Sequence, residues 1–337
     1  MNHKKQIKQY LLVGLTGLLG LQMVACAGKT QSSDGQDTVA QQRIDCLRAA
    51  IPFDADSAYS YVAQQVSLGA RVPGSEAWQA CSRWIEDRLR AFGAEVSLQE
   101  TRVRTFDGKE LPCRNIVASF NPDASRRVLL GAHWDSRPFA DQDPSEANRS
   151  KPVSGADDGA SGVGVLLELA RQWGRQKPLL GIDIVLFDVE DYGSSNDDES
   201  WCLGSTYWAK NPHKPNYSAE YGILLDMVGA KGAKFYQEGF SRDFAPLVVA
   251  KIWDKAASLG YGELFVQAGG SYLTDDHLPI QRHRAIRMAN IVNYDPARTK
   301  GFGDHWHTAN DNMEVIDKAT LEAVGKTVMA VIDDEQP

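Results

Sequence analysis

Residues 182–191 read IDIVLFDVED, an apolar run that ends in acidic residues. Apolar side chains occupy both parities of this run, so it lacks a polar face, as expected of a central strand that helices cover on both sides. We therefore expect a buried strand with Glu190 and Asp191 at its polar end. Carboxylates in such a place are costly to bury unless a cation lies between them. An isolated Glu-Asp pair more commonly caps a helix or faces water. The choice between these interpretations and a cation site therefore depends on the rest of the chain.

Further short apolar runs alternate with segments of helical spacing, the pattern of an α/β protein. We predict a mixed, mostly parallel central sheet with helices on both faces, in a single domain. The runs at residues 94–120 alternate around Asp107-Gly108, which predicts strands joined by a turn. The other expected strands cover residues 127–132, 221–225 and 286–292, and the expected helices cover residues 57–68, 76–92 and 244–259, the helix opened by the loop at 155–164, and a last helix capped by Asp317.

Acids or histidines follow several of these strands. In a mostly parallel sheet, ligands bind at the carboxyl ends of the strands, so these side chains are expected to converge at one edge. The Gly-rich loop at residues 155–164 carries two aspartates, which would repel a phosphate and therefore favour a cation over a nucleotide. Together the strand ends and later loops supply His133, Asp135, Asp158, Glu190, Asp191, Asp226, Asp275 and His307.

The residue types at this edge favour zinc. The sequence contains seven histidines. Three of them lie at the N-terminus or in a polar context, which leaves His133, His277, His305 and His307 as candidates. Carboxylates with one or two imidazoles and no Cys-x-x-Cys pair suit a catalytic Zn²⁺ that keeps one position open for substrate. Glu190, next to a ligand but itself free, would then be the general base.

The order of these motifs resembles that of a family of zinc aminopeptidases and animal-type glutaminyl cyclases, which share one α/β fold. The motifs are His133-x-Asp135, Gly155-Ala156-Asp157-Asp158, Glu190-Asp191, Asp226 and Trp306-His307-Thr308, and Arg71-Val72-Pro73-Gly74-Ser75 matches the family's opening. The resemblance covers about residues 54–332. The double aspartate Asp275-Asp276 before His277 and the aromatic residues near the metal loops are similar to bacterial members of the cyclase branch.

The resemblance implies an enzyme that converts the N-terminal glutamine of peptides or proteins to pyroglutamate and releases ammonia. It implies one Zn²⁺ held by Asp158, Asp191 and His307, although His305 remains an alternative ligand to His307. Glu190 would transfer the proton, Asp275 would share it, and Asp226 would lie behind Asp275. The aromatic residues implied to hold the glutaminyl side chain are Trp201, Phe302 and Trp306.

Two other functions remain open. A zinc aminopeptidase of the same fold would bind a second metal through His133 and Asp226 and use Glu190 to activate water. A binding protein that captures substrate without turning it over is the alternative that is not an enzyme. Two departures from the family pattern also stand: Asp191 replaces the more usual Glu, and Arg284-Ala285-Ile286-Arg287 replaces a Gly-Ile-Pro turn.

The formal net charge of the 337-residue chain is -8. Residues 1–25 contain Lys4, Lys5 and Lys8 and no acid, so without them 33 basic and 44 acidic side chains leave -11. This balance argues against nucleic acid or an anionic membrane surface as a partner and allows neutral or cationic substrates. We expect a monomer that contacts a membrane only through a lipid anchor.

The first 25 residues predict export, because a basic start precedes an apolar centre that is too short for a permanent membrane span. Met23-Val24-Ala25-Cys26 is similar to the lipobox of bacterial lipoproteins, which implies lipidation of Cys26 and a periplasmic location, with plain secretory cleavage as the alternative. Residues 26–45 are predicted to be a flexible tether and residues 46–337 the catalytic domain. The other cysteines are Cys46, Cys81, Cys113 and Cys202, expected in disulfides or as buried thiols.

Overall fold

The structure is a computed structural model that describes residues 33–335. Residues 44–337 form one compact unit, which contains the sheets, and residues up to Arg43 belong to another. The helices are α1 (Ser33–Ala50), α2 (Ala55–Ser67), α3 (Glu76–Ala91), α4 (Ala160–Arg175), α5 (Leu203–Lys210), α6 (Gly239–Phe244), α7 (Pro246–Ser258), α8 (His277–Arg284) and α9 (Lys318–Asp333), with 3₁₀ turns η1 (Asp198–Ser200) and η2 (Met313–Val315).

The main sheet has six strands in the order β1-β2-β4-β3-β5-β8. The pairings of β3 with β4, β3 with β5 and β5 with β8 are parallel, whereas β1–β2 and β2–β4 are antiparallel. The strands are β1 (Glu95–Arg104), β2 (Glu110–Phe120), β3 (Arg127–His133), β4 (Gly181–Phe187), β5 (Tyr221–Asp226) and β8 (Met288–Val292), and β6 (Phe235–Gln237) pairs with β7 (Phe265–Gly269) in a small second sheet.

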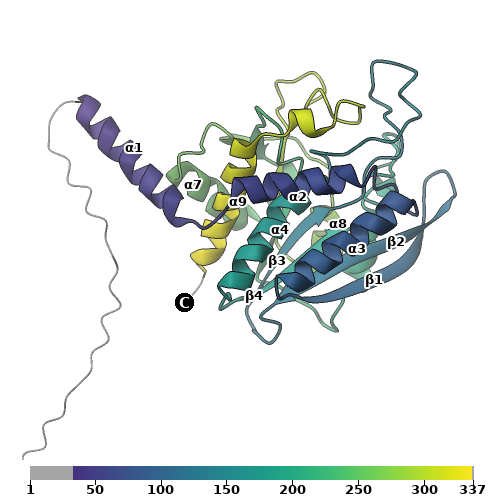
Figure 1. The fold of residues 1–337 in the computed structure, drawn as a ribbon, viewed down its shortest axis with the longest axis horizontal. Coiled ribbons are helices and arrows are strands. Elements are labelled where there is room, and N and C mark those ends of the chain that lie inside the picture. The colour runs from purple at the N-terminus through teal and green to yellow at the C-terminus, as the bar shows by residue number, and fades with distance from the viewer. Residues whose placement is uncertain (1–32, 336–337) are drawn as a thin grey trace, which may run out of the picture. The chain divides into compact units, whose positions relative to one another are not determined.

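Strand β4 explains why helices cover both faces. Alternate side chains point to opposite faces of a sheet. Ile182 and Ile184 pack in the larger core, which includes residues of α2, α3, α4, α7 and α9, and Val185 and Phe187 pack in a second core with residues of α5 and α8. Figure 1 shows α2, α3, α4 and α9 over the face turned toward the viewer. The predicted fold class, a mixed and mostly parallel sheet with helices on both faces, is confirmed.

Two local predictions need correction, and two short strands were not predicted. Residues 33–45 of the predicted tether are helical and belong to α1, because residues 37–50 are rich in helix-forming Ala, Gln, Arg and Leu. The helix predicted over residues 244–259 is divided, since Pro246 occupies the first position of α7, where a missing N–H is tolerated, and α6 ends at Phe244. Strands β6 and β7 were not predicted, because runs this short carry too little periodicity.

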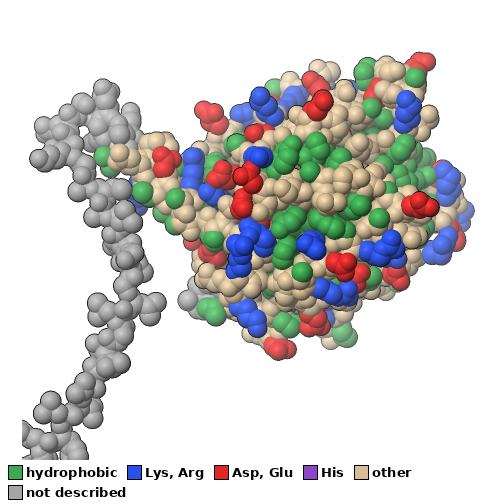
Figure 2. All heavy atoms as spheres, viewed as in Figure 1, with side chains coloured by type: hydrophobic (Ala, Val, Ile, Leu, Met, Phe, Trp, Pro, Cys, Tyr) green, Lys and Arg blue, Asp and Glu red, His purple; other side chains and the backbone are tan. Residues whose placement is uncertain are grey.

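The signal segment and Cys26 lie outside the described residues. Within residues 33–335, the structure contains no helix of the length and apolarity that a membrane crossing requires. Cys81, Cys113 and Cys202 are buried free thiols, which agrees with one of the two alternatives for the cysteines. On the face drawn in Figure 2, basic and acidic side chains are interspersed around apolar areas.

Candidate active site

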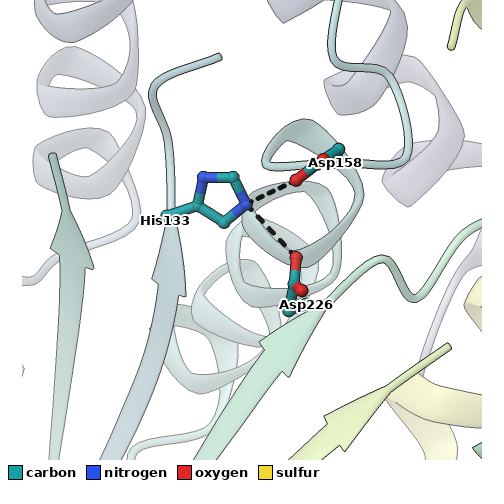
Figure 3. Close-up of side chains that lie close together, drawn as sticks. All are labelled: His133, Asp158 and Asp226. Atoms are coloured by element: carbon teal, nitrogen blue, oxygen red, sulfur yellow. Dashed lines mark hydrogen bonds and ion pairs between the residues drawn. The ribbon is translucent and has the colours of Figure 1, made fainter. Parts of the chain in front are cut away.

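Acidic and imidazole side chains meet at the carboxyl ends of the parallel strands. His133 is the last residue of β3 and Asp226 the last residue of β5, and Asp158 comes from the loop before α4. Figure 3 shows the His133 ring directed toward both carboxylates. Its Nε2 atom lies 3.0 Å from Asp158 Oδ1 and 3.2 Å from Asp226 Oδ1. Burial alone would lower the pKa of His133, but its hydrogen bonds with Asp135, Asp158 and Asp226 raise it well above the usual value.

A second group consists of Asp158, Asp191 and His307, the three residues expected to hold the metal. All three are buried, and their ligand atoms lie within 4.8 Å of one another. His307 Nε2 is 3.2 Å from Asp191 Oδ1 and 3.6 Å from Asp158 Oδ2. Tetrahedral zinc with bonds of about 2.0–2.1 Å separates its ligand atoms by about 3.3 Å.

The donor chemistry of this group also fits zinc. Asp191 Oδ2 is buried and has no hydrogen-bond partner among the described residues, which is costly for a carboxylate oxygen without a cation. His305 contributes to neither group, because its Nε2 lies 2.8 Å from Asp157 Oδ2. The described geometry therefore favours His307 over His305 as the imidazole ligand. His277 is also elsewhere, 3.0 Å from Glu238.

Two residues that the sequence did not single out support this group from behind. Asp141 Oδ1 lies 3.5 Å from His307 Nδ1, and Arg137 pairs with Asp141 at 2.6 Å and with Asp191 Oδ1 at 3.3 Å. Burial raises the pKa of Asp141, but its bonds with His307 and Arg137 outweigh burial and hold that pKa far below its usual range. A carboxylate close to a ligating histidine commonly fixes its orientation. The signal in the sequence was the charged loop after Asp135, where Asp141 is one of three acids that the sequence does not distinguish.

The loop that carries Asp158 is held from two sides. Arg71 is fully buried and donates to the carbonyls of Ser154 and Gly155, the latter at 2.6 Å. This contact gives the Arg-Val-Pro-Gly-Ser segment a structural role in the site. The backbone N–H groups of Asp157 and Asp158 donate to Asp311, whose pKa burial and the nearby acids raise to about 7.

Glu190 and Asp191 do not extend strand β4, which ends at Phe187. Val189 has φ 51°, a left-handed conformation that is strained for a β-branched residue. The turn aims the next backbone N–H groups at Asp135, with Glu190 N and Asp191 N each 3.2 Å from one of its carboxylate oxygens. The strand was expected to reach Glu190 and Asp191, and this expectation is wrong by three residues. The strained turn at Val189 changes the direction of the chain before the two acids.

Backbone strain recurs around the site. Besides Val189, the left-handed residues other than glycine include Cys202, Met227 and His307, with φ between 49° and 57°. His307 is itself a predicted metal ligand, Met227 follows Asp226 in the sequence, and Cys202 contacts Glu190. Such conformations cost about 1–3 kcal/mol each and persist where the surrounding structure imposes them.

Glu190 belongs to a third group, with Cys202 and Asp275. The Cys202 thiol donates to Glu190 Oε1 at 3.4 Å. Burial raises the pKa of Glu190 well above the usual range, although the charge of His133 opposes this. Asp275 accepts from the Asn290 amide at 2.6 Å, and burial also raises its pKa.

The structure brings Asp226 to His133, and the charge of Asp275 acts on its carboxylate. Its described hydrogen-bond partner is His133, and burial and the charge of Asp275 raise its pKa well above the usual range. Asp226 and Asp275 line one pocket together with Glu190, so the three acids predicted to handle protons share one space.

Aromatic rings form one wall of this pocket, whose volume is about 270 Å³. Trp306 stacks on His307 with ring centroids 3.8 Å apart, and Phe302 stacks on Trp306 at 4.5 Å. Trp201 stacks on His307 at 5.9 Å, and its indole N–H donates to Ser194 O. The three predicted aromatic residues therefore line the same pocket as Glu190 and the group of Asp158, Asp191 and His307.

Residues 115–332 match the family described as Peptidase family M28. The chain belongs to this family. The glutaminyl cyclase of Porphyromonas gingivalis is 55% identical, with 85% of this chain and 100% of that chain covered and a TM-score of 0.84. A leucine aminopeptidase precursor from Bacteroides thetaiotaomicron is 47% identical, with 85% and 99% covered and a TM-score of 0.82. The glutaminyl-peptide cyclotransferase of Bos taurus is 25% identical over 295 residues, 78% of this chain and 77% of that protein.

Proposed function

We propose that this chain is a glutaminyl-peptide cyclotransferase, which closes an N-terminal glutamine into pyroglutamate and releases ammonia. One observation carries this: a small pocket walled by Trp201, Phe302 and Trp306 has Glu190 and the acid-imidazole group in its lining. The flat faces of the aromatic rings suit a planar amide side chain packed against them. The similarity to glutaminyl cyclases over nearly the whole of their chains supports the same reaction here.

Asp158, Asp191 and His307 would hold one Zn²⁺. When bound, zinc supplies a Lewis acid for the γ-amide carbonyl of the substrate. Asp141 and Arg137 keep His307 and Asp191 in place for this task. The aromatic wall stacks directly on His307, so a side chain held against that wall lies beside the ligand group.

Glu190 performs the proton transfer. In the reaction the substrate's α-amine nitrogen bonds to the γ-amide carbon, and the bond from that carbon to the amide nitrogen breaks. Glu190 accepts a proton from the amine and returns one to the departing nitrogen, which leaves as ammonia. The raised pKa of Glu190 and its place in the pocket suit a group that must both accept and donate. Because amine and amide belong to one residue, the pocket's main task is to hold the folded conformer.

Asp275 and Asp226 assist in different ways. Asp275 lies in the same group as Glu190, and the Asn290 amide fixes its carboxylate, so it can share the transferred proton. Asp226 bonds to His133, which also contacts Asp158, and thereby holds that ligand carboxylate in position.

The aminopeptidase alternative has one observation in its favour. His133, Asp158 and Asp226 form a second group whose ligand atoms lie within 4.8 Å of one another, with Asp158 common to both groups. A second metal bound there would leave Glu190 to activate water. In the described structure His133 Nε2 lies 3.0 Å from Asp158 and 3.2 Å from Asp226.

One assay separates these functions. The purified chain is incubated with one peptide that begins with Gln and another that begins with Leu, and both are followed by mass. Loss of ammonia from the first is expected. Release of free Leu from the second would overturn the proposal in favour of the aminopeptidase, and two unchanged peptides would leave a binding protein. Metal analysis of the same sample, with one zinc expected per chain, tests the ligand assignment.

We also propose that the chain is exported as a monomer and anchored in the periplasm by a lipid on Cys26. The support is the signal-like composition of residues 1–25 and the lipobox-like segment before Cys26. Membrane fractionation of cells that express the full chain and the Cys26→Ser variant tests this. Loss of the variant from the membrane fraction is expected, and equal distribution of both proteins would contradict the anchor.

A further inference from the structure

An exposed apolar surface begins at the mouth of the pocket. Tyr272 lines the pocket, yet 55% of its side chain is exposed. Its ring meets Phe240 edge-on with centroids 4.9 Å apart, and Phe240 stacks on Phe244 at 6.4 Å. Phe244 is 53% exposed, and Leu247, three residues further on in the first turn of α7, is 76% exposed. We call these four residues the apolar ridge.

The ridge is held in a defined position. The Tyr272 hydroxyl donates to Asp243 at 3.0 Å, and the backbone N–H of Leu273 donates to Glu238 Oε1, also at 3.0 Å. The buried Glu238 side chain accepts from the backbone N–H groups of Phe240 and Ser241 at the start of α6. Glu238 therefore ties the loop that carries Tyr272 to the helix that carries Phe240 and Phe244.

The concentration of exposed apolar side chains here is unusual. Among residues 39–335, the exposed large hydrophobic side chains are Val39, Leu47, Leu98, Phe106, Leu179, Phe244, Leu247 and Tyr272. The last three belong to the ridge, which alone of these positions continues into the pocket lining. Large apolar side chains exposed together commonly mark a binding surface.

We propose that the apolar ridge binds apolar side chains of the substrate polypeptide that follow its N-terminal glutamine. The inference rests on the cyclase function proposed above. In the proposed reaction the N-terminal glutamine occupies the pocket, so the rest of the polypeptide must leave past its exposed lining, which includes Tyr272. An extended chain advances about 3.3 Å per residue. The steps of 4.9 and 6.4 Å between the ridge rings therefore span about three extended residues, so the ridge can contact about three of the residues that follow the glutamine.

The test compares substrates and variants in one assay. The substrates are the amides of Gln-Ala, Gln-Ala-Leu-Leu-Ala and Gln-Ala-Ser-Ser-Ala. The proteins are the wild type, a double variant Phe244→Ser/Leu247→Ser, and Leu179→Ser, which alters an equally exposed apolar side chain (63%) outside the ridge and the pocket. Ammonia release gives kcat and KM, and calorimetry gives the affinity for each peptide.

Wild type and Leu179→Ser are expected to show a KM about tenfold lower for the Leu peptide than for the Ser peptide, because the ridge partly buries one Leu side chain of the peptide. The double variant should lower this ratio below about twofold and keep the wild-type kcat and KM for Gln-Ala amide, which does not reach Phe244 or Leu247.

Equal KM values for the two pentapeptides in the wild type would overturn the proposal, as would a preference that survives in the double variant. A dimer of the wild type that the double variant loses would instead assign the ridge to self-association. If Gln-Ala amide releases no ammonia with any of the proteins, the cyclase function fails, and the calorimetric affinities still decide whether the ridge binds apolar peptides.

Discussion

Replacing Glu190 with glutamine removes the proton acceptor and leaves the shape of the pocket unchanged. The side chain bonds to Cys202 and belongs to a different group from Asp158, Asp191 and His307, so zinc affinity should be retained. General acid-base catalysis contributes about 10²–10⁴-fold. At about 1.36 kcal/mol per tenfold, the variant should therefore lose about 2.7–5.4 kcal/mol of transition-state stabilisation.

The assay measures ammonia release from a Gln peptide together with zinc content and peptide affinity. We expect kcat to fall by about 10²–10⁴-fold while zinc content and affinity stay close to wild type. Glu199→Gln is a matched control, because this exposed acid lies in the following loop and pairs with Arg282. The role of Glu190 would be refuted by a kcat within tenfold of wild type, and a parallel loss of zinc would show that Glu190 acts through the metal group.

Three further outcomes are expected. Asp141→Ala should weaken zinc binding about 10–100-fold in a chelator competition, because His307 Nδ1 loses its carboxylate partner; unchanged affinity would contradict this role. Cys202→Ala should lower kcat about tenfold without changing KM, and Cys202→Ser should restore most of it, since a hydroxyl can also donate to Glu190; equal activity of both variants would argue against positioning by the thiol. Asp183→Ala should destabilise the fold by about 3–5 kcal/mol in denaturant unfolding, because it leaves Arg127 buried without the carboxylate that it contacts at 2.7 Å. Burial raises the pKa of Asp183, but the bonds of its carboxylate with Arg127 and Ser119 bring this pKa below the usual value. The carboxylate therefore stabilises the fold above about pH 3.9, and this stabilisation is lost as the pH falls through the lowered pKa of the folded state. Wild type should show this loss in acid unfolding, and Asp183→Ala should not.

Several features of the site could be predicted before the structure because they depend on local order along the chain. Strand β4 is apolar on both parities, and both faces are in fact buried, one in each core. The acids and His307 lie where the carboxyl ends of parallel strands bring them. The aromatic residues Trp201, Phe302 and Trp306 were identified by resemblance to a family, and the structure places all three around one pocket.

Other features could not be predicted because they depend on pairs of residues that are distant in sequence. Asp141 is one of three acids in a charged loop, and only the structure shows that it lies 3.5 Å from His307. The contact of Cys202 with Glu190 requires the left-handed conformations of both Val189 and Cys202, and nothing in the local sequence favours a β-branched residue there. The apolar ridge joins α6, α7 and the loop of Tyr272, and only the fold shows that it borders the pocket.

The sequence by itself determined that a buried strand leads to Glu190 and Asp191, and that acids and histidines converge at its end. Periodicity and chain order suffice for this, because parallel strands carry their carboxyl ends to one edge. Only the tertiary structure decided which histidine meets which acid: His307 faces Asp191, His133 faces Asp226, and His305 turns to Asp157. The physical reason is that hydrogen bonds and ion pairs act over about 3 Å, a distance that the order of residues along a chain does not specify.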